Sequence, residues 1–160
     1  MKPTKKQILL FLISFLCISC NEIVKVREIT KILFRQSPEK FDANNLIGFA
    51  CYSEGVESNP VRAYSELIKN RKYAVIIEKL KSENAAEKYL STIVCKRLEQ
   101  KKLITLTKSE FDQINDIMSS QKIIIICAGC TEEEELTIED MFSDNFLTED
   151  IEEWLSNNIK

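Results

Sequence analysis

Four amphipathic segments in the middle of the chain constrain its fold most. Between residues 59 and 118, apolar side chains recur every three or four positions, which places them on one face of an α-helix. Short polar stretches separate the segments, and helices joined by short connections pack as antiparallel neighbours. The pattern predicts a mainly α-helical single domain of antiparallel amphipathic helices, arranged as a bundle or like a helical repeat.

Residues that start helices mark three of these segments. The start signals are Asn59 before Pro60, Asn84 before Glu87, and Thr107 before Glu110. Asn and Thr side chains cap the free backbone N–H groups of a first turn, and Pro is favoured at the first helical position. A Glu three residues after the cap completes a capping box. We therefore expect helices over 60–69, 73–80, 84–100 and 107–118.

The regions on either side of these four segments combine short extended segments with short helices. The apolar stretch 46–51 and the β-branched run 123–126 predict short extended segments near 46–51 and 122–127. Residues 137–142 and 148–157 carry acidic residues in their first turns, where the helix dipole favours them, so we expect two terminal helices there. Residues 60–82 and 84–120 differ in length and share no motif, so no sequence repeat supports a solenoid.

Charge divides the chain into parts. Residues 131–160 hold eleven acidic residues and one lysine, whereas the whole chain has 25 acidic and 22 basic residues. We divide the chain into a leader (1–19), a tether with irregular or helical structure (20–58), a helical core (59–130) and an acidic C-terminal helical segment (131–160). Phosphate contacts supply most non-specific nucleic-acid affinity, so we expect no nucleic-acid partner for an acidic protein.

The first twenty residues have the layout of an export signal. Three lysines precede an apolar run over 8–18, and Ser19 and Cys20 follow it. A membrane-spanning helix needs roughly 20 apolar residues, so the run is too short for a lasting anchor. A basic start followed by a short apolar run is typical of a signal peptide that is removed.

The end of this leader resembles the lipobox of bacterial lipoproteins. In that family a small residue, here Ser19, precedes a cysteine, here Cys20, that carries a diacylglyceryl group and becomes the first residue. The resemblance implies a lipoprotein with a palmitate-type anchor at Cys20, exported and held on a bacterial membrane, with the outer membrane expected. Such an anchor is durable, because each buried CH₂ contributes about 0.8 kcal/mol.

Several catalytic classes are excluded by composition. The chain has no histidine and three glycines. It therefore cannot form Ser-His-Asp or Cys-His machinery, and it holds no glycine-rich phosphate loop. Its acidic residues lie in contiguous runs, unlike the separated carboxylates of glycosidases. We expect no enzyme activity, no cofactor and no small-molecule substrate.

One cysteine motif has chemical content. Cys127 and Cys130 form a C-x-x-C after an apolar run and before a run of glutamates. The order resembles the strand–CxxC–helix of thioredoxin-like proteins, in which a helix N-terminus depresses the pKa of the first thiol. This resemblance implies a thiol–disulfide oxidoreductase that uses Cys127 and Cys130. No proline follows the motif and only thirty residues remain after it, so we favour a structural role.

The structural role leaves several pairings open. An exported protein meets an oxidising compartment, which favours disulfides. Cys127 and Cys130 can pair locally, or Cys51 can pair with one of them and join the segment 46–51 to the run 123–127. Sequence alone cannot choose among the pairings of four cysteines. Cys95 is either packed on a second face of its helix or a free thiol, and one C-x-x-C is weak support for a zinc site.

A basic stretch offers a candidate surface for a partner. Ten lysines and arginines lie between residues 69 and 102. They could form a docking face for an acidic partner or a lipid surface, a solvated helix face, or a cradle for the acidic C-terminal segment, and we favour the solvated face. Taken together, we expect a lipid-anchored envelope protein that binds or scaffolds an envelope protein, including the immunity and inhibitor types.

Overall fold

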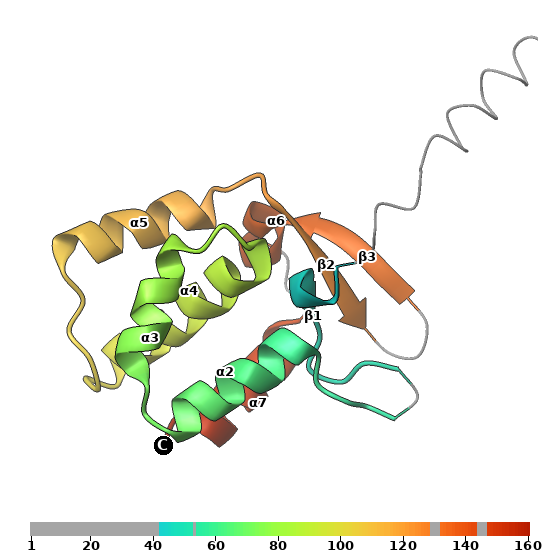
Figure 1. Ribbon diagram of the computed structural model, residues 1–160, viewed down its shortest axis with the longest axis horizontal. Helices are drawn as coiled ribbons and strands as arrows, with labels where there is room; N and C mark the ends of the chain where they lie inside the picture. The colour runs from blue at the N-terminus through green and yellow to red at the C-terminus, as the bar shows by residue number, and fades with distance from the viewer. Residues whose placement is uncertain (1–41, 53, 129–131, 144–146) are drawn as a thin grey trace, which may run out of the picture. The chain divides into compact units, whose positions relative to one another are not determined.

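A computed structural model describes residues 42–52, 54–128, 132–143 and 147–160 of the chain. Asp42–Lys160 forms one compact unit, which is mainly helical and includes a small three-stranded sheet (Figure 1). The prediction of a mainly helical domain is confirmed. In chain order the elements are the 3-10 helix η1 (Ala43–Asn45), β1 (Leu46–Ile47), α2 (Asn59–Lys69), α3 (Tyr73–Glu78), the 3-10 helix η2 (Lys79–Lys81), α4 (Ala85–Gln100), α5 (Lys108–Met118), β2 (Ile123–Ala128), β3 (Glu132–Thr137), α6 (Ile138–Ser143) and α7 (Thr148–Asn158).

The predicted helix starts are confirmed at two of three positions. The side chain of Thr107 accepts from the backbone N–H of Glu110, whose carboxylate accepts from the backbone N–H of Thr107, so α5 begins with a full capping box. The Asn84 side chain caps α4 by accepting from Glu87 N at 2.9 Å. The prediction for α2 is wrong by one residue, because Ser58 is the N-cap and Asn59 is already helical. Pro therefore occupies the second helical position, where its missing N–H is also tolerated.

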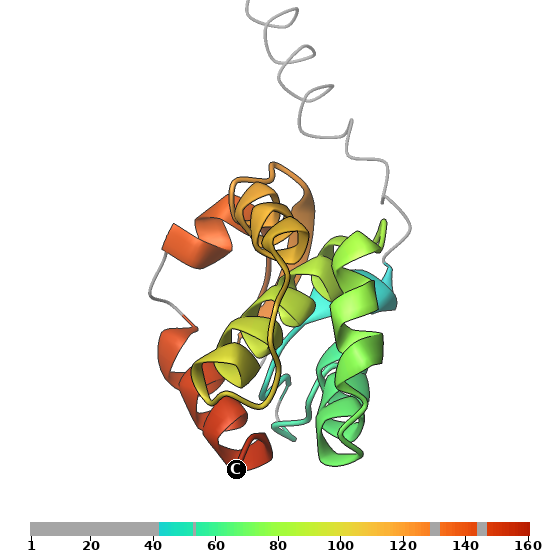
Figure 2. The same ribbon diagram turned by 90° about the vertical axis from the view of Figure 1, so that its left-hand side faces the viewer.

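Helix α4 lies at the centre of the unit. Its buried residues are spread around the helix, not along one stripe, and it contacts α2, α3, α5 and β2. Figure 2 shows the green α2–α3 pair to the right of α4 and the gold α5 above α4. A helix that is buried on all sides belongs to the core. Cys95 is fully buried there, so it is packed on a second face of the helix, one of the two alternatives left open above.

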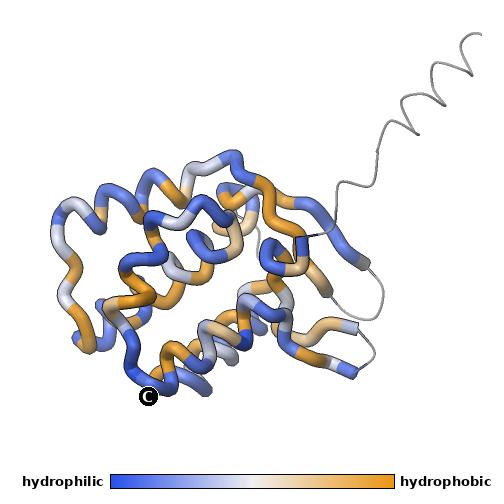
Figure 3. The backbone as a smooth tube through the Cα atoms, in the orientation of Figure 1, coloured by the Kyte–Doolittle hydropathy of each residue, from blue (hydrophilic) through white to orange (hydrophobic). Residues whose placement is uncertain are grey.

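The three strands form one sheet in the order β1-β2-β3. β1 is parallel to β2, with Leu46 opposite Ile125 and Ile47 opposite Ile126. β2 and β3 are antiparallel. The hydrophobic colour of β2 contrasts with the hydrophilic start of β3 in Figure 3. The expected extended segment near 122–127 is confirmed as β2, and that near 46–51 is a strand only over Leu46–Ile47, after which the chain forms a loop.

The two faces of the sheet pack differently. Ile47, Ile124 and Ile126 belong to the main core beneath the helices. The alternate residues point to the other face, as the pleat requires. There Leu46 and Cys127 form a separate buried cluster with Cys51, and Ile125 packs against it. The sheet therefore separates the helical core from a small thiol-containing cluster.

The acidic segment departs from the sequence prediction. Residues 131–160 were expected to be helical, but Glu132–Thr137 is a strand. Glutamate disfavours strands, yet β3 supplies the antiparallel hydrogen-bonding partner of β2 along its whole length. The glutamates Glu133, Glu134 and Glu135 are exposed. Charged residues on an outer strand also discourage pairing with another chain.

The two predicted terminal helices are confirmed as α6 and α7. α6 begins with a cap in which Asp140 N donates to Thr137 Oγ1 at 3.0 Å. On α7, Trp154 and Leu155 are buried in the main core. None of the helices in the described part of the chain is both long enough and apolar enough to cross a membrane.

Candidate functional site

A short closed loop carries one of the predicted cysteines. Gly48 and Ser58 pair at its base, because Ser58 N donates to Gly48 O at 2.8 Å and Gly48 N donates to Ser58 Oγ at 3.2 Å. Further out, Cys51 and Val56 exchange backbone hydrogen bonds of 2.8 and 3.0 Å. Gly55 has a φ of 61°, which glycine adopts without strain. The loop therefore holds Cys51 in a fixed place above β2.

Cys51 lies against Cys127. The two residues are 1% and 3% exposed, and the Cys51 thiol points to the carbonyl oxygen of Cys127 at 3.9 Å. They belong to the same cluster on the outer face of the sheet. The structure therefore brings together two of the predicted site residues, which are 76 positions apart in the sequence.

Gly48 makes room for this contact. A Cβ atom at position 48 would overlap Cys51 Sγ and would lie 2.8 Å from Cys127 O and 3.1 Å from Cys127 Cβ. Real Cβ atoms essentially never lie within 3.0 Å of such atoms, and packed interiors leave little space for the neighbours to move. The glycine therefore permits the close approach of the two cysteines.

The surroundings of Cys51 and of Cys95 oppose ionisation of their thiols. Burial raises the pKa of Cys51 to about 12, helped by the neighbouring Cys127 and by Glu133. Burial also raises the pKa of Cys95 to about 12, with a smaller contribution from Glu110. Thiolates are the reactive form of cysteine. Neither Cys51 nor Cys95 has the environment of a catalytic nucleophile.

The remaining predicted site residues lie elsewhere. Cys20 and Cys130 fall outside the described residues. Within the described residues, Cys51, Cys95 and Cys127 are free thiols. The thioredoxin-like order of elements is corrected, because the element that follows the C-x-x-C is the strand β3 and not a helix. The helix dipole that lowers a thiol pKa in that family has no counterpart at Glu132–Thr137.

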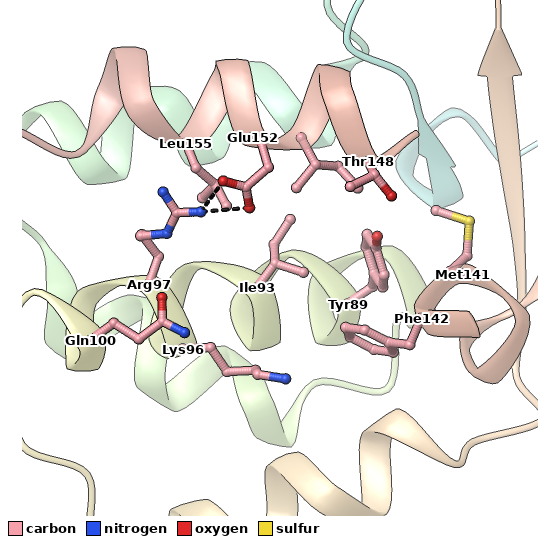
Figure 4. A pocket seen from close by; sticks show the side chains of 11 residues that line it. Tyr89, Ile93, Lys96, Arg97, Gln100, Met141, Phe142, Thr148, Glu152 and Leu155 are labelled. Carbon is pink, nitrogen blue, oxygen red and sulfur yellow. Dashed lines mark hydrogen bonds and ion pairs between the residues drawn. The ribbon is translucent and has the colours of Figure 1, made fainter. Parts of the chain in front are cut away.

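A groove lies between α4 and the two terminal helices. Its volume is about 330 Å³. Figure 4 shows Ile93 and Arg97 on α4 pointing toward α7, with Phe142 of α6 at one end of the groove. The residues that line it are Tyr89, Ile93, Lys96, Arg97, Gln100, Met141, Phe142, Thr148, Ile151, Glu152 and Leu155. Apolar side chains with a few polar groups at the rim are typical of binding pockets.

The charged rim of the groove is organised by one ion pair. The Arg97 guanidinium donates to both carboxylate oxygens of Glu152, which joins α4 to α7. Lys96 lies 5.9 Å from the centre of the Phe142 ring and donates to Met118 Sδ at 3.4 Å. In the part of the chain that the structure describes, no carboxylate pairs with Lys96. Its ammonium group instead contacts Phe142 and Met118 at the rim.

The basic stretch as a whole makes few contacts with the acidic C-terminal segment. Among the described residues, Arg97–Glu152 is the ion pair that connects them. Lys101 adds a 3.0 Å hydrogen bond to the carbonyl oxygen of Ile159. Lys69 pairs instead with Glu66 of its own helix α2, and Lys79 of η2 pairs with Glu87 of α4. The cradle for the acidic segment is thus limited to the C-terminal end of α4.

Comparison with known proteins gives no relative: no family model, no curated protein and no solved structure matches this chain.

Sequence reasoning missed two features of these sites. Gly48 was noted only as one of three glycines, because its role depends on a contact between distant segments. The groove was also missed, because nothing in the sequence separates Lys96 and Arg97 from the eight other basic residues between 69 and 102. The one sequence signal for the groove was the predicted helix 148–157, in which one apolar face adjoins the acidic residues of 148–153.

Proposed function

We propose that this chain is a lipid-anchored protein of the bacterial cell envelope, and that its folded unit binds another envelope protein. The observation that carries the binding part is the groove between α4 and α7, with its apolar floor and charged rim. The leader 1–20 supports the anchor. Immunity and inhibitor proteins belong to the same class of non-enzymatic binders.

The anchor would be the lipid on Cys20. Residues 20–41 would then separate the membrane from the folded unit, which begins at Asp42. Labelling cells with a palmitate analogue tests this. We expect label on the wild type and on Cys17→Ala, and none on Cys20→Ala. Label that survives in Cys20→Ala would refute the assignment.

The groove has the chemistry of a site for a polypeptide segment. Ile93 and Ile151 provide an apolar surface, while Gln100 and Thr148 provide hydrogen-bonding groups at its edge. Lys96 adds a positive charge without a carboxylate partner among the described residues. A segment with an apolar side chain next to an acidic one would satisfy both. Binding sites of this kind derive most of their affinity from a few central contacts.

A site-specific photo-crosslinker tests this proposal in intact envelopes. We expect a single protein adduct when the crosslinker replaces Gln100, and none when it replaces Glu66, whose side chain is 62% exposed on α2. Lys96→Glu should reduce the Gln100 adduct about tenfold through loss of charge complementarity. Lys69→Glu makes the same charge change outside the groove and should leave the adduct unchanged. Equal adducts from both positions would argue against the groove.

The helical arrangement is part of the same proposal. Contacts run from α2 to α3, from α3 to α4 and from α4 to α5, which supports successive helices packing as neighbours in a bundle-like or repeat-like order. Such arrangements present grooves between helices as binding surfaces.

The alternative function is a thiol–disulfide oxidoreductase that uses Cys127 and Cys130. Insulin reduction by the purified protein would favour that alternative.

A further inference from the structure

Cys51 and Cys127 are placed for a covalent cross-link. Two thiols, each nearly inaccessible to solvent, meet on the outer face of the sheet. A closed loop brings one, and the register of β1 with β2 and of β2 with β3 fixes the other. Disulfides require two cysteines whose Cβ atoms face each other at short range. Here the Cys51 thiol lies 3.9 Å from the carbonyl oxygen of Cys127, and Gly48 leaves the space that this thiol occupies, because a Cβ at position 48 would overlap Cys51 Sγ.

We propose that Cys51 and Cys127 form a disulfide bond in the exported protein, and that this bond fixes the 48–58 loop on the sheet. The inference rests on the proposed export, because thiols in reducing compartments do not stay paired. It selects one pairing among those that the sequence leaves open. It also assigns Cys95 as an unpaired thiol, since that residue is fully buried in the main core and away from this cluster.

The reaction is a thiol–disulfide exchange with an oxidised protein dithiol or oxidised glutathione. One cysteine, as its thiolate, attacks a sulfur atom of the oxidant, and the oxidant S–S bond breaks to leave a mixed disulfide. The second cysteine then loses its proton and attacks, so that the Cys51–Cys127 bond forms and the second oxidant sulfur leaves as a thiolate. The two protons end on the reduced oxidant, and two electrons pass to it.

The environment favours a stable cross-link over a redox catalyst. Oxidising catalysts work because their reduced form is stabilised as a thiolate. Burial and Glu133 raise the pKa of Cys51 to about 12, so this thiolate is not stabilised. The bond would close a loop of 76 positions, and long loops benefit most from a cross-link.

Peptide mapping without reductant tests the pairing on the full chain extracted from membranes. Trypsin places Cys51 in the peptide 41–62, Cys95 in 89–96, and Cys127 with Cys130 in 123–160. We expect 41–62 linked to 123–160, with fragmentation placing the bond on Cys127, and we expect 89–96 unlinked. The link should persist in Cys130→Ser and disappear in Cys127→Ser. A Cys127–Cys130 bond, or fully reduced cysteines in the lipidated protein, would overturn the inference.

A second arm separates this inference from the proposed export. Purified reduced protein, treated with oxidised glutathione, should form the same link whatever its cellular location. Its thermal midpoint should then rise by about 10 °C or more relative to the reduced form, as expected for a long closed loop. Lipid on the N-terminal peptide 20–25 of the processed chain reports export independently. If the lipid is present and oxidation gives another pairing, the inference fails while the export proposal stands.

Discussion

The indole N–H of Trp154 donates a 2.9 Å hydrogen bond to the hydroxyl of Ser65, which joins α7 to α2. The Ser65 hydroxyl in turn lies 3.3 Å from a carboxylate oxygen of Glu57. The Phe49 ring packs on the indole, with ring centres 5.4 Å apart. Trp154 therefore anchors α7 to two other parts of the chain. Phe49 precedes the predicted helical core, and Ser65 lies within it.

Substitutions at this contact should weaken the docking of α7. Ser65→Ala leaves a buried indole N–H without its acceptor, at a cost of about 1–2 kcal/mol. Urea unfolding followed by fluorescence measures this directly, because the chain contains a single tryptophan. Ser156→Ala on the exposed face of α7 is the matched control and should change the free energy of unfolding by less than about 0.5 kcal/mol. Equal effects would show that the hydrogen bond contributes nothing.

The capping box of α5 predicts a second loss of stability. Thr107→Ala removes the acceptor for the backbone N–H of Glu110 and should cost about 1 kcal/mol. Thr105→Ala, at an exposed position two residues earlier, is the control and should be neutral. Chemical denaturation of both variants is the measurement. A neutral Thr107→Ala would mean that tertiary packing alone determines where α5 begins.

Glu87 predicts a specific dependence on pH. Its partial burial opposes ionisation, but hydrogen bonds from Lys79 and Ser82 and the charge of Lys79 outweigh this and lower its pKa below 4.5. A carboxyl group with a lowered pKa stabilises the fold above its unfolded value, and the contribution disappears as the pH falls through its folded value. The free energy of unfolding should therefore fall more between about pH 6 and pH 3 for the wild type than for Glu87→Gln.

The matched control for this pH series is Glu66→Gln. Glu66 pairs with Lys69 on an open surface, with side chains 62% and 74% exposed, and such pairs contribute little. Its pH profile should follow the wild type. Parallel profiles for Glu87→Gln and the wild type would contradict the stabilising role of the Lys79–Glu87 pair.

Gly48 predicts a steric effect that a second substitution relieves. Gly48→Ala should cost about 1–3 kcal/mol, because its Cβ would overlap Cys51 Sγ. Cys51→Ala in the same chain should recover part of this loss, and the double-mutant cycle measures how much. Gly55→Asn is the control, since position 55 has open space and a φ that Asn tolerates. Simple additivity of the two substitutions would place the strain elsewhere.

Local signals explain why the helices were predictable. Thr107 with Glu110 and Asn84 with Glu87 are recognisable without knowledge of the tertiary structure, and both cap as expected. The error at α2 is a single residue, because Ser58 and Asn59 are both good caps. Ser58 also accepts a hydrogen bond from Gly48 N, a distant contact that sequence does not reveal.

Tertiary contacts explain what the sequence did not predict. The four glutamates of Glu132–Thr137 disfavour a strand, and the segment forms β3 because the strongly β-forming Ile123–Ala128 lies beside it. Likewise, Cys51 meets Cys127 because the two-residue strand β1 pairs with β2. The groove forms where α6 and α7 lie beside α4, and Arg97 and Glu152, which pair across it, are 55 positions apart. Each of these three features depends on contacts between residues far apart in the chain, and local sequence patterns are compatible with several such contacts.

The intact mass of the protein extracted from the membrane fraction of its native cells tests the lipoprotein claim most directly. The account predicts a chain from Cys20 to Lys160 carrying two or three acyl chains, and a Cys20→Ala variant that lacks them. A mass that corresponds to the unmodified chain beginning at Met1 would contradict the account.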